Sequence, residues 1–209
     1  MKINPRELTE QGYVLKEELD HQELMSFIQK CFKEKTIISG LYNWINLGFL
    51  FCLLALFLYN CIEQKEPLGD GILCLAYGIA IAFLLIPLHE YIHVLAYRYV
   101  GAKDTSYDYN LKQFYFMAIA DKFVISYEEF KIVALAPFLA VFLLGILMLP
   151  FISIAWWYFP LGMVLTHSAF CSGDFGLLNY FEQHKDQELV SYDDKTNKLS
   201  YFFVKEKMD

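Results

Sequence analysis

The sequence predicts an all-α membrane protein with four transmembrane helices, small cytoplasmic β-hairpin elements and an N-terminal amphipathic helix. Hydrophobic residues make up 56% of the 209 residues and charged residues only 20%, a composition too apolar for an ordinary soluble domain. Four apolar stretches are each long enough to cross a hydrocarbon core of about 30 Å, which takes about 20 helical residues. They run over about 39–62, 71–98, 131–151 and 154–181.

The segment before the first span, residues 1–36, is polar and is predicted to be cytoplasmic. Within it, residues 20–34 place apolar side chains on one face of a helix and lysines on the opposite face, the pattern of an amphipathic helix. The apolar positions are Leu24, Met25, Ile28 and Phe32. Such a helix either lies on the membrane surface or packs against the protein's own cytoplasmic face, and the sequence leaves both arrangements open.

Two polar regions are expected to contain short strands. The first is an insert between the second and third spans, residues 102–128, where Tyr107 and Tyr109 alternate with polar residues. This period of two predicts one or two strands near the inner face of the membrane. The second is the tail, residues 182–209, where two short apolar runs flank a turn-like Asp-Asp-Lys-Thr-Asn-Lys, which predicts a β-hairpin.

The charges indicate the orientation and exclude one class of partner. Lysines gather before the first span, in the 102–128 insert and in the tail, whereas the connection at 150–154 has no basic residue. Basic residues are retained on the cytoplasmic side, so both termini are predicted to be cytoplasmic. With a net charge of −7 and no Lys/Arg cluster, the chain is not expected to bind nucleic acid. The five cysteines form no CxxC pair, so no disulfide framework is predicted.

The second span contains His89-Glu90-Tyr91-Ile92-His93, which is the pattern H-E-x-x-H. On a helix the two histidines project from nearly the same side one turn apart, so both can ligate one Zn²⁺. Around the helix axis Glu90 projects to one side of the two histidines, beside the metal. There its carboxylate can take a proton from the attacking water. Ionisable groups inside a membrane span are costly and mark functional sites. We therefore expect a zinc site here.

A third ligand is expected from the fourth span, because catalytic zinc usually has three protein ligands. His167, Cys171 and Asp174 share one face of that helix. Counted along straight helices at about 1.5 Å per residue, Asp174 lies at the depth of His89, and His167 lies roughly 10 Å nearer the bilayer centre. Asp174 is therefore the predicted ligand, unless it serves as a helix-packing acceptor or pairs with a lysine. His167 is the alternative ligand or a hydrogen-bond partner of one, and Cys171 is assigned to packing.

The other marked positions are expected to have structural roles. Pro87 frees the carbonyl of Phe83 and predicts a kink just before the motif. Pro137 and Pro160 are expected only to adjust their helices. The remaining histidines, His21 and His184, are expected on the surface because they lie in polar segments.

The chain resembles a known family at three places. Its second, third and fourth spans carry "PLHEYIH", "ALAPF" and "SGDF", and in this it resembles the bacterial membrane family described as putative zincin peptidases, which is in turn similar to the site-2 proteases. The resemblance implies that His89, His93 and Asp174 ligate zinc and that Glu90 is the catalytic base. It makes residues 37–181 a four-helix metalloprotease-like domain in a prokaryotic cytoplasmic membrane.

One departure from the pattern concerns the third ligand. Site-2 proteases commonly have glycine after the aspartate, whereas Asp174 is followed by Phe175. Zincins with soluble domains use a downstream glutamate instead, which would be Glu128 or Glu129 here. Both precede the third span, so they are the poorer candidates.

These observations predict a membrane-embedded zinc metalloprotease that hydrolyses peptide bonds of membrane-associated substrates. Its expected partners are the lipid bilayer and a peptide or membrane-protein substrate, and a homo-oligomer is compatible with the sequence. Because a substrate helix must unwind to expose its peptide bond, residues 105–119 are a candidate edge for strand addition. The alternatives are a non-catalytic metal-binding protein that binds partners and, less favoured, a transporter that relays ions.

Overall fold

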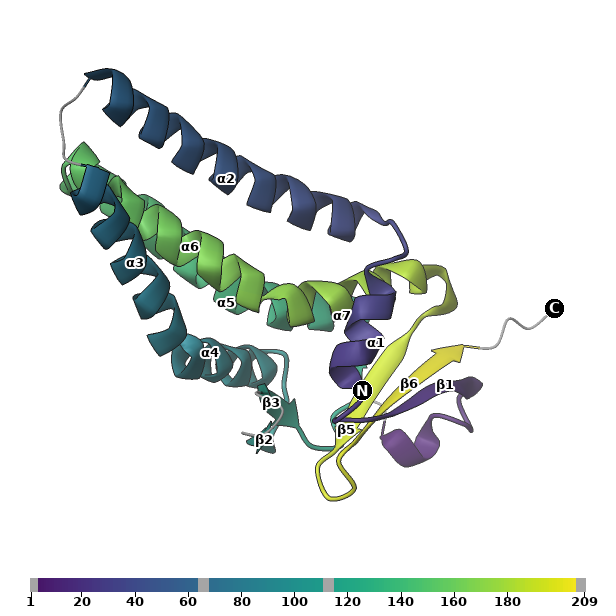
Figure 1. Cartoon of the computed structure of the whole chain (residues 1–209). Helices are drawn as coiled ribbons and strands as arrows, with labels where there is room; N and C mark the ends of the chain where they lie inside the picture. Colours follow the sequence, from purple (N-terminus) through teal and green to yellow (C-terminus); the bar gives the residue numbers. More distant parts are fainter. Residues whose placement is uncertain (1–3, 64–67, 111–114, 206–209) are drawn as a thin grey trace. The chain divides into compact units, whose positions relative to one another are not determined.

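The computed structural model describes residues 4–63, 68–110 and 115–205, and Figure 1 shows the helices and strands that they form. The chain divides into two compact units. Unit 1 contains Met1–Ser39, Glu90–Ala136 and Gly173–Asp209. Unit 2 contains Gly40–His89 and Pro137–Ser172. The predicted sequence domains 1–36, 37–181 and 182–209 stay a prediction, and their outer ends lie beyond the described residues.

Unit 2 consists of helices that pack closely through small residues. Its main elements are α2 (Ile37–Glu63), α3 (Leu68–Leu84), the first turn of α4 (Ile86–Tyr99), the second half of α5 (Tyr127–Met148), η2 (Leu149–Phe151), η3 (Ile154–Trp157) and α6 (Tyr158–Phe170). A Cβ atom built on Gly78 of α3 would lie 2.2 Å from the carbonyl oxygen of Phe159, and one on Gly162 of α6 would lie 2.7 Å from Leu75 Cδ1. Glycine at these positions therefore lets α3 and α6 approach backbone to backbone.

Within the described residues, two helices are long and apolar enough to cross a membrane, namely α2 and α5 extended to Phe151. The bent pair α3 and α4 makes a third if it counts as one span. The fourth predicted span, 154–181, is not confirmed, because it is divided into η3, α6 and α7 (Ser172–Gln183) with a break at Cys171. The 13-residue α6 alone reaches only about 20 Å.

The second predicted span is kinked where the sequence placed the kink. Helix α3 ends at Leu84, α4 begins at Ile86, and the two are bent by 46°. Pro87 has no N–H to continue the ladder, and its ring crowds the carbonyl four residues earlier. The HExxH motif therefore lies on its own short helix.

Unit 1 contains strands, so the all-α prediction is wrong for this part of the chain. A four-stranded antiparallel sheet has the order β1-β6-β5-β4, and a separate hairpin pairs β2 with β3. The strands are β1 (Tyr13–Asp20), β2 (Thr105–Asn110), β3 (Tyr115–Ala120), β4 (Ile125–Ser126), β5 (Val190–Asp194) and β6 (Leu199–Lys205). The hairpins predicted in the insert and in the tail are present. The β1 strand was not predicted, because its register shifts between Leu15 and Glu17 and the period of two is lost there.

The predicted amphipathic helix is α1 (Leu24–Cys31), shorter than 20–34 because β1 extends to Asp20. Leu24, Ile28 and Cys31 are buried. Ile28 contacts α7, where a Cβ built on Gly176 would lie 2.5 Å from Ile28 Cγ2. Of the two arrangements left open by the sequence, the structure thus favours packing on the protein.

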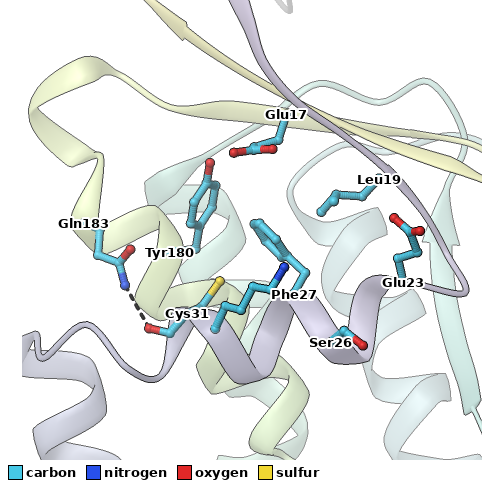
Figure 2. A pocket seen from close by; sticks show the side chains of 9 residues that line it. Glu17, Leu19, Glu23, Ser26, Phe27, Cys31, Tyr180 and Gln183 are labelled. Carbon is cyan, nitrogen blue, oxygen red and sulfur yellow. Dashed lines mark hydrogen bonds between the residues drawn. The ribbon is translucent and has the colours of Figure 1, made fainter.

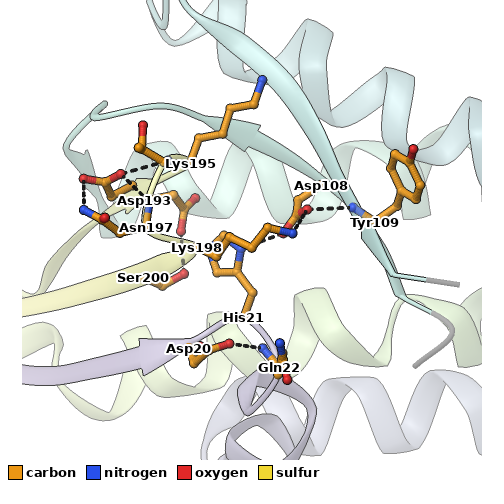
Figure 3. A network of polar contacts seen from close by, with 12 residues as sticks. Asp20, His21, Gln22, Asp108, Tyr109, Asp193, Lys195, Asn197, Lys198 and Ser200 are labelled. Carbon is orange, nitrogen blue, oxygen red and sulfur yellow. Dashed lines mark hydrogen bonds and ion pairs between the residues drawn. The ribbon is translucent and has the colours of Figure 1, made fainter. Parts of the chain in front are cut away.

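His21 is buried, so its prediction as a surface histidine is wrong. Its Nδ1 lies 2.9 Å from Asp108 Oδ2 in β2, and Lys198 Nζ lies 3.0 Å from the other oxygen of Asp108 (Figure 3). His21 follows β1 directly and is covered by these neighbours, which the local sequence does not reveal. His184 is half-buried, and its ring N–H donates to the carbonyl of Tyr180, 2.9 Å away.

Candidate metal centre

Helix α4 presents the motif inside the protein. His89, Glu90 and His93 are all buried, and one ligand atom from each lies within 4.8 Å of the other two. This is the spacing expected when two histidines follow each other one helical turn apart. The boundary between the two units falls within α4, between His89 and Glu90.

The ring of His93 is oriented by a main-chain carbonyl. Its Nδ1 donates to the carbonyl oxygen of Val133 in α5 at 3.0 Å, which turns Nε2 toward the site. In an α-helix the carbonyl of Val133 would accept from the N–H of residue 137, but that residue is Pro137 and has no N–H. Pro137 therefore leaves this carbonyl to His93, and it does more than adjust its helix. Sequence analysis missed this role, although the spacing of four residues was its signal.

Asp174 lies against the other nitrogen of the same ring. Its Oδ1 is 3.1 Å from His93 Nε2. Two ligand atoms of a tetrahedral zinc ion are about 3.3 Å apart when each is about 2.0–2.1 Å from the metal. The break at Cys171 places Asp174 in the first turn of α7, where the helix dipole favours a carboxylate. The imidazole nitrogen and the carboxylate oxygen are thus of the types that zinc binds, and their separation is close to that of two ligands of one zinc ion.

Glu90 is held by the β2–β3 hairpin. Its Oε2 accepts a hydrogen bond from the N–H of Ala118 in β3 at 2.7 Å. A main-chain donor fixes the carboxylate without neutralising it, so the group keeps its capacity to accept a proton. Glu90 and Asp174 both belong to unit 1, and each has a ligand atom near a nitrogen of His93.

His89 also has neighbours in unit 2. Its Nδ1 lies 3.1 Å from His167 Nε2 and 3.9 Å from Cys171 Sγ, and Cys171 Sγ lies 3.6 Å from His167 Nδ1. The predicted 10 Å offset in depth between His89 and His167 is therefore wrong. That prediction counted residues along straight helices, but α3 and α4 are bent by 46°. Cys171 is buried as expected for packing, but it also belongs to this cluster.

The glutamates considered as alternative ligands lie elsewhere. Glu129 accepts hydrogen bonds from the N–H and hydroxyl of Ser126, both at 3.1 Å, at the start of α5. Glu128 is exposed. Among the residues that the structure describes, neither belongs to a group of side chains that could hold a metal.

A separate pocket of about 500 Å³ lies among β1, α1 and α7 of unit 1 (Figure 2). Its lining includes Glu17, Phe27, Cys31 and Tyr180 and none of the predicted site residues. Burial raises the pKa of the Cys31 thiol to about 11. The thiol is therefore protonated at neutral pH, which does not suit a nucleophile.

One comparison with known proteins identifies the family. A family model described as "Putative zincin peptidase" matches residues 82–189, just over half of the chain. The chain belongs to this family. The matched region of this zincin-type chain contains His89, Glu90, His93 and Asp174. Membership indicates a metallopeptidase that uses zinc. No curated protein and no solved structure matches.

Proposed function

We propose that the protein is a membrane-embedded zinc metallopeptidase in which His89, His93 and Asp174 hold the ion and Glu90 is the general base. The observation that carries the proposal is the 3.1 Å separation between His93 Nε2 and Asp174 Oδ1, with the opposite nitrogen of His93 engaged by Val133. Such a partner on the far side of a ligand ring is typical of zinc sites. The family and the apolar helices α2 and α5 support the same function.

The chemistry assigned to the chain's own groups is proton transfer and orientation. When bound, zinc acts as a Lewis acid toward a peptide carbonyl and lowers the pKa of water. Glu90 accepts the proton of the attacking water and delivers it to the departing amide nitrogen. The N–H of Ala118 holds the Glu90 carboxylate in place during both transfers.

The proposed substrate is a membrane-associated polypeptide bound in extended form along β2. Ala118 is paired with Tyr107 and gives its N–H to Glu90. Because the Ala118 N–H bonds to Glu90 and not to β2, Tyr107 and Ala118 form a non-hydrogen-bonded pair of the ladder. In such a pair the main-chain groups of both residues point away from the partner strand, so the N–H of Tyr107 faces the outer edge of β2. The variant Tyr107→Pro should lower cleavage and leave the zinc content unchanged. Turnover equal to that of the wild type would contradict this binding mode.

The proposed location is a prokaryotic cytoplasmic membrane, with several spans and both termini in the cytoplasm. Termini on one side require an even number of crossings, so η3 and α6 together would supply the fourth. Reporter fusions at each end test this arrangement, and both are expected to report a cytoplasmic position. Opposite positions would indicate an odd number of spans.

The function is tested on the full chain purified in detergent. The variants His93→Ala and Asp174→Ala should lose bound zinc, measured by metal analysis. Glu90→Gln should keep the zinc and lose about 10²–10⁴-fold in peptide hydrolysis, the usual contribution of a general base. Glu128→Gln is the matched control, because Glu128 is exposed, and it should retain both properties.

The same variants separate the alternatives. Full zinc content in both His93→Ala and Asp174→Ala would remove the basis of the site. A non-catalytic metal-binding protein would keep its biological function when Glu90 is replaced by glutamine. An ion-relaying transporter would show proton- or metal-dependent flux in vesicles and no hydrolysis.

A further inference from the structure

We propose that unit 2 carries a second metal site, formed by His89, His167 and Cys171, which binds a borderline or soft cation of the zinc type. The site goes beyond the proposed peptidase function and shares one residue, His89, with it. Its three side chains come from α4, from the last turn of α6 and from the break that follows α6.

The distances among the three side chains fit a single ion. One ligand atom from each residue lies within 4.8 Å of the other two. Cys171 Sγ lies 3.6 Å from His167 Nδ1 and 3.9 Å from His89 Nδ1. A sulfur and a nitrogen bound to one tetrahedral zinc are about 3.5 Å apart, with bonds of about 2.3 and 2.1 Å. His167 faces Cys171 with Nδ1 and faces His89 with Nε2, 3.1 Å from His89 Nδ1, so its ring must turn for one nitrogen to join both partners around the ion.

The chemistry of the cluster differs from that of the HExxH group. His167 and Cys171 are 1% and 0% exposed and His89 is 6% exposed, so the ligands are withdrawn from water. Imidazole and thiolate together favour zinc or copper(I) over magnesium or calcium, which prefer oxygen. Binding requires the Cys171 thiol to release its proton, so occupancy should fall at low pH.

Sharing of His89 is possible because an imidazole ring has two nitrogens. His89 directs Nδ1 to His167 and Cys171. Its Nε2 is then the atom for the HExxH group. Because a neutral imidazole keeps one N–H, binding of both ions requires His89 to release that proton to solvent and to bridge them as an imidazolate. We therefore expect the two sites to be coupled, so that loss of one ion changes the affinity for the other.

Cobalt(II) is the probe, because a thiolate bound to cobalt gives a charge-transfer absorption band in the near ultraviolet and carboxylate and imidazole ligands do not. The full chain is purified in detergent with the exposed Cys52 and Cys61 replaced by serine. This protein is expected to bind two cobalt ions and to show the band. Cys171→Ser should abolish the band and one equivalent of cobalt. Cys74→Ser, which removes another buried thiol of unit 2, should change neither.

Further variants distinguish this proposal from the peptidase site. Asp174→Asn should lose the other equivalent of cobalt and retain the thiolate band. His167→Ala should lower the affinity for the ion that gives the band by at least about tenfold, because a lost ligand is worth 1.4 kcal/mol or more. Absence of the band at saturating cobalt would overturn the second site. So would loss of the band in Asp174→Asn, because Cys171 would then ligate the same ion as Asp174.

X-ray absorption on the zinc-loaded protein tests the site without any ligand variant. A sulfur neighbour at about 2.3 Å from zinc is expected, and a shell of nitrogen and oxygen alone would contradict the proposal. If the band is present but Asp174→Asn keeps every equivalent of metal, the peptidase centre fails while the second site stands.

Discussion

The two units of the molecule place different kinds of side chain around the first and the last histidine of the HExxH motif. Unit 1 places two carboxylates, Glu90 and Asp174, around His93. Unit 2 places a second imidazole and a thiol, His167 and Cys171, around His89. Oxygen-rich surroundings suit proton transfer, whereas thiolate suits tight binding of a soft ion. The comparison teaches that one short helix can direct its two histidines to different sets of partners.

The units are also stabilised differently. Unit 2 depends on close approach of helices at Gly78 and Gly162. Unit 1 depends on buried polar contacts, of which Asn179 in α7 is the centre. Asn179 donates to the carbonyls of Cys31 and Glu34 at 2.8 and 3.0 Å and accepts from the Ser39 N–H at 3.1 Å. The following predictions test this difference.

The largest effect is expected for Asn179→Leu in unit 1. The substitution removes the donors to two backbone carbonyls and the acceptor of a buried N–H. Each buried polar group left without a partner costs about 1–3 kcal/mol, so we expect a loss of about 3 kcal/mol. Thermal unfolding in detergent measures it. Asn197→Ala, in the exposed turn of the tail hairpin, is the control and should cost less than about 1 kcal/mol.

The next effect compares one glycine from each unit. In Gly78→Ala the new Cβ would meet the backbone oxygen of Phe159 at 2.2 Å, whereas in Gly176→Ala it would meet the side chain of Ile28 at 2.5 Å. A side chain can rotate away and a helix backbone cannot. We expect a loss of about 2–3 kcal/mol for Gly78→Ala and about 1 kcal/mol for Gly176→Ala. Equal losses would show that the helices of unit 2 are as adaptable as a side chain.

A smaller effect is expected for Pro137→Ala. Alanine restores an N–H at position 137, which competes with His93 for the carbonyl of Val133. Loss of such a partner usually lowers metal affinity about 10–100-fold, and we expect the lower end because the carbonyl can accept two hydrogen bonds. Zinc competition with a chelator measures the change. Pro160→Ala, in α6, removes a proline from a helix that holds none of the three proposed zinc ligands, and it should leave zinc affinity unchanged.

The smallest effect is a dependence on pH at the end of α7. Burial alone would raise the pKa of the Glu182 carboxyl, but hydrogen bonds from Lys185 and Tyr127 hold the pKa below its usual value. A lowered pKa adds stability above the unfolded-state value of about 4.3, and this contribution is lost as the pH falls through the folded pKa. Glu182→Gln should remove that acid sensitivity, which amounts to less than about 1 kcal/mol of the free energy of unfolding. Unfolding curves at pH 7 and pH 3 provide the measurement.

The sequence predicted features that depend on local chemistry. The kink at Pro87, the common face of His89 and His93 and the two hairpins follow from proline geometry and from periods of 3.6 and two residues. The β1 strand was hidden by the register shift near Glu17, because periodicity is the only signal for a polar edge strand.

Features that depend on the path of a bent chain were not predictable in the same way. The contact between His89 and His167 was missed because residue counting gives depth only along a straight helix. The burial of His21 depends on Asp108, which is 87 positions away. By contrast, the link between Pro137 and Val133 was available from the sequence, since a proline always releases the carbonyl four residues earlier in a helix.

The pairing of β1 with β6 has a consequence for the order in which the protein is made. Unit 1 is built from the first, middle and last thirds of the chain, and Asp174, β5 and β6 all belong to the last. During synthesis β1 must therefore remain without this neighbour until residues Leu199–Lys205 have been made. The proposed zinc centre includes Asp174, so it can form only after this later part of the chain has been synthesised.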